Sequence, residues 1–336
     1  MRTSTFVVTP NVAVVKYWGK RDNQLNLPDN GSISVTMDET VRTITSVEFN
    51  PNLVRDSLIL NGKPAKENEL VRAVKVLDAI RKKAGIKNKA CVISENNFPT
   101  AAGLASSASG FAALACAGAE AAGLEATERE LSIFARLGSG SACRSVLGGF
   151  VEWKKGSRKD GLDSYAVQLA SSSHWPELRN IITIVDPGRK RIGSAEGMEI
   201  TTRTSKLYMK RVKENPKLLS AMRRAIRRRD LENFLMLTMC ESSRMHAVMM
   251  DSFPPIIYLN DVSREIIESV LGFNTSKGMS CAGYTFDAGP NAHVYTISKY
   301  EKEVRTLLSE INGVEKIIIS KPGEGPRRLP DDKSLI

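Results

Sequence analysis

Hydrophobic and polar positions alternate along the first part of the chain, a pattern typical of strands that bury one face. Residues 5–18, TFVVTPNVAVVKYW, predict two strands separated by a Pro-Asn break. Residues 32–49 and 57–65 continue this β-rich pattern. Within the second of these segments, Asn61-Gly62 is a strong signal for a hairpin turn.

Two helices are expected within this β-rich half. Residues 67–85 carry apolar side chains at the helical period and end at Gly85, a typical helix stop. Residues 107–123, SASGFAALACAGAEAAG, predict a helix of small side chains that must pack closely against its neighbours. The runs GGFVEW, YAVQLA and NIITIVDPGRK, which follow, read as further strands.

Beyond about residue 190 the pattern changes to longer helices. They are predicted at residues 195–212, 215–229, 230–251 and 260–271. A hairpin-like pair of strands at 281–298, an amphipathic helix at 299–313 and a last strand at 314–323 complete the chain. This change predicts an α+β protein of two domains, residues 1–187 and residues 188–336.

The composition is that of an ordinary globular protein, with 336 residues of which 42% are hydrophobic. No run approaches the roughly 20 apolar residues that a membrane helix needs, and the N-terminus is too short and polar for a secretory signal. We therefore expect a cytoplasmic protein with no membrane partner. The five cysteines are scattered and lack CxxC spacing, which favours buried thiols over a disulfide frame or a zinc site.

The net charge of +11 is compatible with a nucleic-acid partner or with a small phosphorylated metabolite. The densest basic run, residues 221–230, places its arginines at helical spacing, which more often marks a solvated helix face than a binding surface. Aromatic residues make up 6% of the chain and are not interleaved with the basic ones. No base-stacking platform is visible, so we expect no nucleic-acid partner.

The strongest local signal is NNFPTAAGLASSASGFAALACA, residues 96–117. A strand ends here, small residues including Gly103, Ser106 and Ser107 follow, and a long Ala-rich helix begins. Small side chains let backbone N–H groups approach phosphate oxygens at a helix N-terminus, where serine hydroxyls can also donate to phosphate or ligate Mg²⁺. The segment matches neither GxxxxGK[ST] nor GxGxxG. A helix that is merely capped and packed through alanines is the open alternative.

A second segment, YTFDAGPNAHVYT at residues 284–296, places two strand-like runs around a compact turn. Asp287 stands at the mouth of this turn without a charged neighbour in sequence. The carboxylate either caps the turn, as aspartate often does, or is kept poorly solvated for chemistry.

Several segments together resemble a known family. PTAAGLASSASG resembles the phosphate-binding motif of the GHMP superfamily of small-molecule kinases, and more narrowly the chain resembles the mevalonate diphosphate decarboxylase family. The likeness is carried, in order from residue 11 to 292, by NVAVVKYWGKRDNQLNLPDNGSISVT, SENNFPTAAGLASSASGFAAL, GSGSACRSVLGGFVEW, DSFPPIIYLND and YTFDAGPNA. It implies a two-domain, GHMP-kinase-like α+β fold with the active site in the cleft between the domains.

The resemblance also implies a reaction that depends on ATP and Mg²⁺. The 3-hydroxyl of mevalonate 5-diphosphate accepts the γ-phosphoryl group of ATP, and the intermediate loses phosphate and CO₂ to give isopentenyl diphosphate. A homodimer is implied as well, while the Mg²⁺ ligands are not assigned. Two alternatives stay open, a decarboxylase of mevalonate 5-phosphate and a GHMP kinase that stops at the phosphorylated alcohol.

Carried over residue by residue, the resemblance implies three catalytic side chains. Asp287 matches the general base, Lys16 would hold that carboxylate and compensate charge, and Arg144 would grip the substrate carboxylate. Further expected substrate contacts are Tyr17, Lys20, Ser139, Gly140 and Ser141. Expected ATP contacts are Asn11, Gly103, Ser106, Ser107 and Ser194. Ala195 follows Ser194 at a position where the family pattern allows a second hydroxyl.

Overall fold

A six-stranded sheet forms the framework of the N-terminal half of the computed structural model, which describes residues 3–98, 106–185 and 192–336. Its strand order is β16-β1-β6-β9-β7-β8. The bounds are β1 (Thr3–Val8), β6 (Thr43–Asn50), β7 (Ser57–Leu60), β8 (Lys63–Pro64), β9 (Lys89–Asn96) and β16 (Arg327–Arg328). The predicted hairpin is confirmed, because Asn61 and Gly62 join β7 to β8 with φ values of 48° and 74°.

The second sheet of this half is four-stranded, in the order β11-β10-β5-β2. Its strands are β2 (Asn11–Val15), β5 (Ser32–Thr36), β10 (Phe150–Trp153) and β11 (Ala166–Ala170). A small ribbon of β3 (Lys20–Asp22) and β4 (Leu27–Pro28) lies between β2 and β5 in the chain. All five residues of β2 are buried, so the chain leaves this strand at Lys16 deep inside the molecule.

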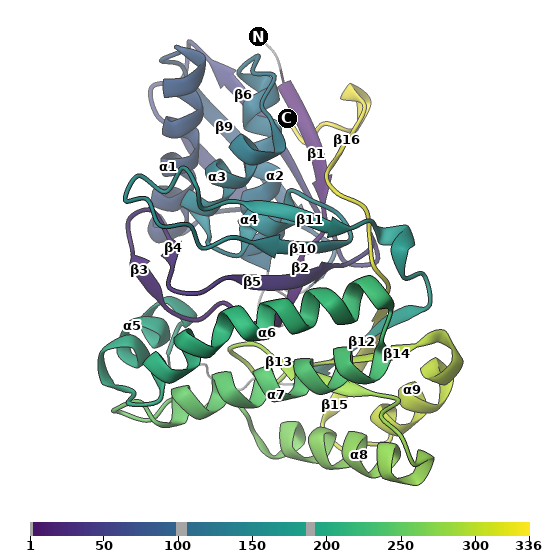
Figure 1. Ribbon diagram of the computed structural model, residues 1–336. Helices are drawn as coiled ribbons and strands as arrows, with labels where there is room; N and C mark the ends of the chain where they lie inside the picture. The colour runs from purple at the N-terminus through teal and green to yellow at the C-terminus, as the bar shows by residue number, and fades with distance from the viewer. Residues whose placement is uncertain (1–2, 99–105, 186–191) are drawn as a thin grey trace.

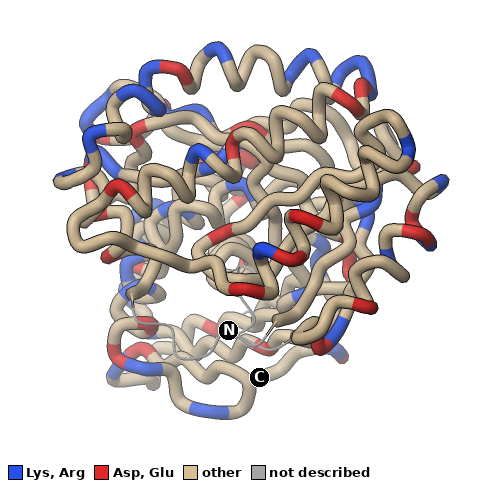
Figure 2. The backbone as a smooth tube through the Cα atoms, turned by 90° about the horizontal axis from the view of Figure 1, so that it is seen from below, with Lys and Arg blue, Asp and Glu red and all other residues tan. Residues whose placement is uncertain are grey.

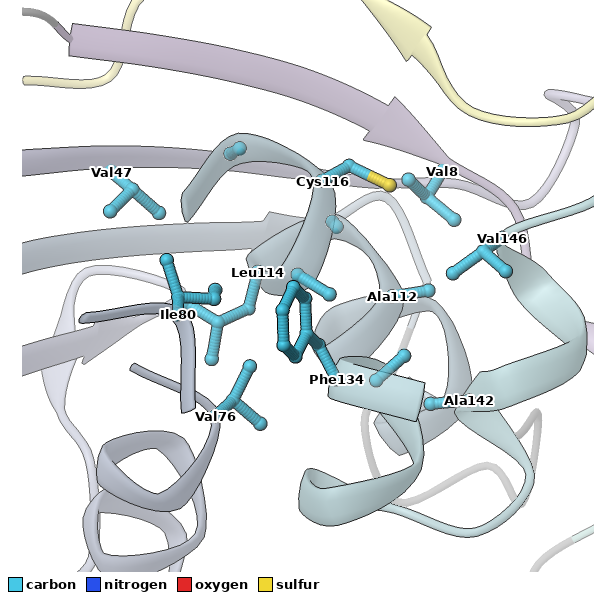
Figure 3. Close-up of a cluster of buried hydrophobic side chains, with 14 of the residues drawn as sticks. Val8, Val47, Val76, Ile80, Ala112, Leu114, Cys116, Phe134, Ala142 and Val146 are labelled. Carbon is cyan, nitrogen blue, oxygen red and sulfur yellow. The ribbon is translucent and has the colours of Figure 1, made fainter. Parts of the chain in front are cut away.

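A group of helices packs against these two sheets (Figure 1). They are α1 (Glu67–Ala84), α2 (Ser106–Ala121), α3 (Glu128–Gly138) and the short α4 (Ala142–Ser145). Figure 3 shows side chains such as Leu114 and Phe134 meeting Val76 and Ile80 in this core. The alanines of α2 let its backbone lie close to the sheet, which confirms the expected tight packing of this helix.

The C-terminal half contains a four-stranded sheet and long helices. The strands, in the order β13-β14-β12-β15, are β12 (Leu178–Val185), β13 (Gly283–Phe286), β14 (Ala292–Ile297) and β15 (Val314–Ser320). The helices are α5 (Ser194–Thr204), α6 (Tyr208–Arg228), α7 (Leu231–Met250), α8 (Asp261–Lys277) and α9 (Glu301–Ser309). This mixture of helix and sheet in two parts agrees with the expected α+β fold.

Helix α6 lies between the upper half and the lower sheet in Figure 1, and α7 contacts both β2 and β13. One hydrophobic cluster joins Val12 and Val14 of β2 to Met222 of α6, Phe234 of α7 and Ile182 of β12. Because this core is continuous, the C-terminal helices fix the position of β2 and of the residues that follow it.

The helix predictions at 195–212 and 215–229 were wrong in their division. The break falls at residues 205–207, where Asp251 accepts hydrogen bonds from the Ser205 hydroxyl at 2.7 Å and from the Leu207 N–H at 3.0 Å. Pro216 then lies inside α6. The buried positions of α6 recur every three or four residues without interruption: Tyr208, Arg211, Asn215, Leu218, Leu219, Met222, Ala225 and Ile226. This continuous face outweighs the local preference of proline.

Two further observations concern the ends of the two halves. β15 is not the last strand, since β16 follows it and pairs with β1. Strand β12 pairs with β14 and β15, so the C-terminal sheet includes residues before the predicted boundary at 187/188. That boundary stays a prediction.

The positive charge is spread over the surface. Figure 2 shows Lys and Arg distributed around the molecule and interleaved with Asp and Glu. In the basic run of α6, Arg223 pairs with Glu152, while Arg227 and Arg228 are exposed. None of the helices in the described part of the chain combines the length and the apolar character needed to cross a bilayer.

Candidate active site

A cleft of about 560 Å³ collects the residues singled out in the sequence. Its walls come from the segment after β2, from α1, from the start of α2, from residues 137–144, from α5 and from the turn between β13 and β14. The predicted site residues that line it are Asn11, Lys16, Tyr17, Lys20, Ser106, Ser107, Ser139, Gly140, Ser141, Arg144, Ser194 and Asp287. Gly103 lies outside the described residues. The structure thus brings these side chains together, while their individual roles stay predictions.

An ion pair between Lys16 and Asp287 stands at the inner end of this cleft. The Lys16 ammonium donates to Asp287 Oδ1 at 2.5 Å. The Lys16 side chain is 1% exposed, so its ammonium does not reach solvent, whereas the Asp287 side chain is 36% exposed and lines the cleft. The pair therefore presents a carboxylate to a ligand from a position that a buried cation fixes.

Burial and charge act against each other in this pair. Burial lowers the pKa of Lys16 below its ordinary value, although the charge of Asp287 and its hydrogen bond oppose this effect. Burial also raises the pKa of Asp287, but the charge of Lys16, together with its hydrogen bond and the charge of Arg144, outweighs this effect and leaves that pKa below its ordinary value. At neutral pH Asp287 is consequently ionised and able to accept a proton.

The turn that carries Asp287 is held from three sides. The Gly289 N–H donates to the Asp287 carbonyl at 2.9 Å, and the Ser263 hydroxyl of α8 donates to the Pro290 carbonyl at 3.0 Å. The side-chain oxygen of Asn291 accepts a hydrogen bond from the Val185 N–H of β12 at 2.7 Å. These contacts fix the direction in which the carboxylate points, as orientation of a reacting group requires.

Arg144 is buried beside the same carboxylate. Its Nε donates to Asn11 Oδ1 at 2.9 Å and its Nη1 donates to the Ser32 hydroxyl at 2.6 Å. Its Nη2 has no acceptor among the described residues, and the side chain lines the cleft. Burial lowers the pKa of Arg144, yet a guanidinium remains charged in proteins. The free edge of this planar cation suits a carboxylate ligand.

Serine hydroxyls form the opposite wall of the cleft. Within the described residues α2 begins at Ser106, and Ser107 lies 3.3 Å from the Ser139 hydroxyl. Ser139 lies in turn 3.5 Å from the Ser141 hydroxyl. A helix of this length directs its first N–H groups and the positive end of its dipole at the cleft, the environment in which phosphate oxygens bind well.

Sequence reasoning missed a cationic wall contributed by α1. Asn68, Arg72 and Lys75 line the cleft together with Lys20. Burial lowers the pKa of Lys20, and the positive charges of Arg72 and Lys75 lower it further. The signal was present in the spacing, since positions 68, 72 and 75 share one face of a helix. Such mutual repulsion is relieved when a polyanion binds.

Tyr17 lies between this cationic wall and Arg144. Its ring packs edge-on against Trp153, with centroids 4.7 Å apart, and its hydroxyl has no hydrogen-bond partner among the described residues. A side chain at Gly140 would approach that hydroxyl to 2.8 Å, so glycine is required there. Burial raises the pKa of Tyr17, which keeps the phenol neutral and able to donate to a ligand oxygen.

Gly19 lets the chain turn between Trp18 and Lys20. Its φ is +105°, and a Cβ atom there would lie 1.7 Å from the hydroxyl of Tyr208, which itself donates to Asp29 at 2.6 Å. The first residue of α6 thereby rests on the backbone that carries Lys20 toward the cleft.

Several residues outside the central group complete the description of the cleft and its surroundings. Burial raises the pKa of Cys143 to about 12, which agrees with a packing role and excludes an active thiolate. Arg21, beside Lys20, is exposed and donates to the Arg158 and Lys155 carbonyls. Residues 94–97 lie in and after β9 and do not line the 560 Å³ cleft. An apolar rim of Trp18, Met198 and Met245 was not anticipated.

The family model "Diphosphomevalonate decarboxylase-like N-terminal domain" matches residues 8–166. The model "Mevalonate 5-diphosphate decarboxylase C-terminal domain" matches residues 180–315. The diphosphomevalonate decarboxylase of Saccharomyces cerevisiae is 43% identical over 324 residues, which cover 93% of this chain and 82% of that relative.

Solved structures agree with the sequence comparison. The mevalonate diphosphate decarboxylase from Staphylococcus aureus superposes with a TM-score of 0.92 at 35% identity, covering 98% of each chain. A complex of MDDEF with MVAPP, AMPPCP and magnesium superposes with a TM-score of 0.90 at 34% identity, covering 97% of this chain and 98% of the other.

Proposed function

This chain belongs to the diphosphomevalonate decarboxylase family, and we propose that its cleft carries out the ATP-dependent decarboxylation of mevalonate 5-diphosphate with Asp287, Lys16 and Arg144 at its centre. The products are isopentenyl diphosphate, ADP, phosphate and CO₂. The cofactor set is ATP and Mg²⁺, as in the solved relative that holds AMPPCP and magnesium.

One observation supports this proposal above the others. Among the described residues that line the cleft, Asp287 is the one carboxylate, and it faces five cationic side chains: Lys16, Lys20, Arg72, Lys75 and Arg144. A site with this balance suits a substrate that carries a carboxylate and a diphosphate beside the phosphates of a nucleotide. The single carboxylate is then the group available to accept a proton.

In the first step Asp287 receives the proton of the substrate's 3-hydroxyl while the oxygen of that hydroxyl forms its bond to the γ-phosphorus and ADP leaves. A carboxylate with a lowered pKa is a weak base, but the transition state of phosphoryl transfer is loose and the proton moves late. The position of the Asp287 carboxylate therefore contributes more to the rate than its basicity does. Lys16 keeps the carboxylate aimed and adds a positive charge near the transferring group.

In the second step the bond between C3 and the phosphorylated oxygen breaks, and the electrons of the C1–C2 bond form the new double bond as CO₂ leaves. We assign Arg144 to the substrate carboxylate, since it lines the cleft and its Nη2 has no acceptor among the described residues. Lys20, Arg72, Lys75 and Tyr17 hold the diphosphate, and the positive charge of the two lysines and of Arg72 favours the departure of an anionic leaving group.

The serine wall fits the nucleotide. Ser106, Ser107 and the first turn of α2 would hold its phosphates, and Asn11 and Ser194 also line the cleft. Mg²⁺ binds through few protein ligands plus substrate phosphates, and the described residues contain no cluster of three His, Cys, Asp or Glu side chains that would form a separate metal cage. The hydroxyl of Ser107 would hold the ion together with the nucleotide, and the ion would neutralise phosphate charge.

The test is product analysis with two substrates side by side. The purified chain is supplied with ATP and Mg²⁺ and with either mevalonate 5-diphosphate or mevalonate 5-phosphate, and ADP, phosphate and CO₂ are measured. The proposal predicts one of each product per turnover with the diphosphate and far slower turnover with the monophosphate. Release of ADP without CO₂ would indicate the kinase alternative, and preference for the monophosphate would indicate the other decarboxylase.

We further propose that the chain forms a homodimer, as the resemblance to the family implies, and that it is cytoplasmic with a domain boundary near residue 187, as the sequence pattern predicts. Sedimentation of the purified chain measures the oligomeric state, and a fluorescent fusion in the source cells reports the compartment.

A further inference from the structure

A second buried ion pair lies directly behind Lys16 and outside the cleft. Arg211 of α6 donates through Nη2 to Oε1 of Glu241 of α7. The two side chains are 5% and 1% exposed, respectively. Neither residue lines the cleft, so neither is available to the substrate.

This pair holds the backbone of Lys16 on both sides. Glu241 Oε1 accepts a hydrogen bond from the Lys16 N–H at 3.2 Å, and Arg211 Nη2 donates to the Lys16 carbonyl at 3.0 Å. Arg211 Nη1 reaches the Trp18 carbonyl at 3.5 Å, and Asn30 adds a second donor to the Lys16 carbonyl at 2.8 Å. The residue that carries the ammonium is therefore fixed by side chains of the C-terminal helices.

Stability alone gives no reason for such a pair. Two charges removed from water lose solvation that their attraction only partly restores, and well-packed hydrophobic residues of similar size are often as stable or more stable. Helices α6 and α7 are otherwise joined by an apolar core that such residues would extend. What hydrophobic residues could not supply is the set of hydrogen bonds to the peptide groups of Lys16.

We propose that the Arg211–Glu241 pair is a positioning device for Lys16, which fixes its backbone and thereby the reach of its ammonium to Asp287. The proposal rests on the catalytic role assigned to Lys16 above. Since Lys16 follows the last residue of β2, the strand ladder no longer holds its peptide groups, and the ion pair takes over where the ladder ends.

The charged and titratable groups that face Lys16 come from several elements. They are Asp287 of the β13–β14 turn, His293 of β14, Glu241 and His246 of α7, Arg144 of α4 and Arg211 of α6. Burial lowers the pKa of both histidines to about 4, so they are neutral at neutral pH. Glu241 is then the second anion beside Lys16, and its charge raises the pKa of the ammonium.

The first test replaces Glu241 by Gln, which keeps the shape and an acceptor oxygen but removes the charge. We expect kcat to fall by about 10- to 100-fold, the scale on which misplacement of a reacting group acts, with KM for mevalonate 5-diphosphate unchanged. The alkaline limb of kcat/KM should move to lower pH. The sign follows because the Glu241 charge favours the protonated ammonium, so that without it Lys16 loses its proton at a lower pH.

Glu152→Gln is the matched control. Glu152 receives two hydrogen bonds of 2.6 Å from Arg223, which lies on the same helix α6 as Arg211, and it joins that helix to β10. This variant removes a partly buried ion pair of the same kind away from Lys16. We expect it to lower the unfolding midpoint while leaving kcat and the alkaline limb unchanged.

A second variant keeps the proposal testable if Glu241→Gln folds poorly. Arg211→Lys retains the charge, but one ammonium cannot reproduce the planar set of donors to Glu241, Lys16 and Trp18. We expect a lower kcat with unchanged KM and a smaller shift of the alkaline limb than in Glu241→Gln.

Lys16→Met, measured in the same assay, separates the two ways of failing. If Lys16→Met abolishes turnover while both pair variants keep wild-type kcat and the wild-type pH profile, the positioning role is overturned and the proposed function stands. If Lys16→Met retains turnover, the assigned role of Lys16 is wrong, and the positioning role is overturned with it.

Discussion

Lys16 and Asp287 are separated by 271 positions in the chain, yet their side chains meet at 2.5 Å in the cleft. Lys16 follows a strand of the N-terminal half, and Asp287 lies in a turn of the C-terminal sheet. The contact exists only when both halves are folded and docked, so the central ion pair reports on the whole tertiary structure.

Replacement of Asp287 by Asn removes the proton acceptor but leaves a side chain of the same size in the turn. We expect kcat to fall by about 10³-fold, within the range that a positioned acid–base group contributes, and binding of nucleotide and substrate to persist in calorimetry. Asp163→Asn is the control, because Asp163 caps an exposed turn through the N–H groups of Ser157 and Arg158. Equal turnover in the two variants would show that Asp287 only caps the turn.

The pH dependence of kcat/KM should show a plateau bounded by the central pair. Activity requires ionised Asp287, whose pKa lies below 3.8, and protonated Lys16, whose pKa lies below 10.5. The acid limb is therefore expected below pH 3.8, unless unfolding comes first, and the alkaline limb below pH 10.5. In Lys16→Arg the alkaline limb should move to higher pH, since guanidinium keeps its proton. An unmoved limb would assign it to another group, such as Lys20.

Arg144→Ala should separate the two chemical steps. The substrate carboxylate loses its partner while Asp287 and Lys16 stay in place, so phosphorylation continues slowly and CO₂ loss is impaired more strongly. Rapid-quench measurement of ADP and CO₂ in a single turnover gives both rates. Arg129→Ala, on the exposed face of α3, is the control. Arg136 is less suitable because its buried guanidinium donates to backbone carbonyls. Equal retention of both steps would contradict the carboxylate assignment.

The cationic wall of α1 predicts a defect in binding rather than in chemistry. Arg72→Ala and Lys75→Ala should raise KM for mevalonate 5-diphosphate by about tenfold each, the loss of roughly one charge-assisted contact, with kcat changed less. Lys82→Ala on the exposed side of α1 serves as the control. An unchanged KM in both cleft variants would show that Arg72 and Lys75 do not bind the diphosphate.

Gly19→Ala tests the support of the Lys20 segment by α6. An added methyl group would clash with the Tyr208 hydroxyl at 1.7 Å and would force alanine to a φ of +105°. Gly85→Ala meets positive φ without any neighbour within 4 Å. We expect Gly19→Ala to lower the free energy of unfolding by about 1–3 kcal/mol more than Gly85→Ala, the usual cost of overpacking. Urea denaturation measures the free energy of unfolding of both variants. Equal decreases would show that the Tyr208 side chain moves to make room for the methyl group.

The sequence pattern predicted much of the local structure. Alternation predicted the strands, and Asn61-Gly62 predicted the hairpin, because these signals depend on neighbouring residues alone. The division of residues 195–229 into two helices was wrong at the point where proline preference and packing disagree. There the buried face of α6, which is fixed by distant parts of the chain, decided the outcome.

The site was predictable only in part for the same reason. The family resemblance, rather than local pattern, selected Lys16, Arg144 and Asp287 as site residues, and the structure places all three at one cleft. Arg72 and Lys75 could have been found as one helix face, but nothing in sequence says that this face meets Lys20. The Arg211–Glu241 contact joins two helices to a third segment, and no spacing rule connects residues 16, 211 and 241.

Strand β16 also bears on the order in which the sheets are completed. One of the two neighbours of β1 in its sheet is β16, at residues 327–328, and the Leu329 N–H donates to the Thr5 carbonyl. Until this segment docks, β1 is an edge strand with unpaired peptide groups, the kind of edge that invites pairing with other chains. The N-terminal sheet is therefore closed by a segment that follows the whole C-terminal sheet in the chain.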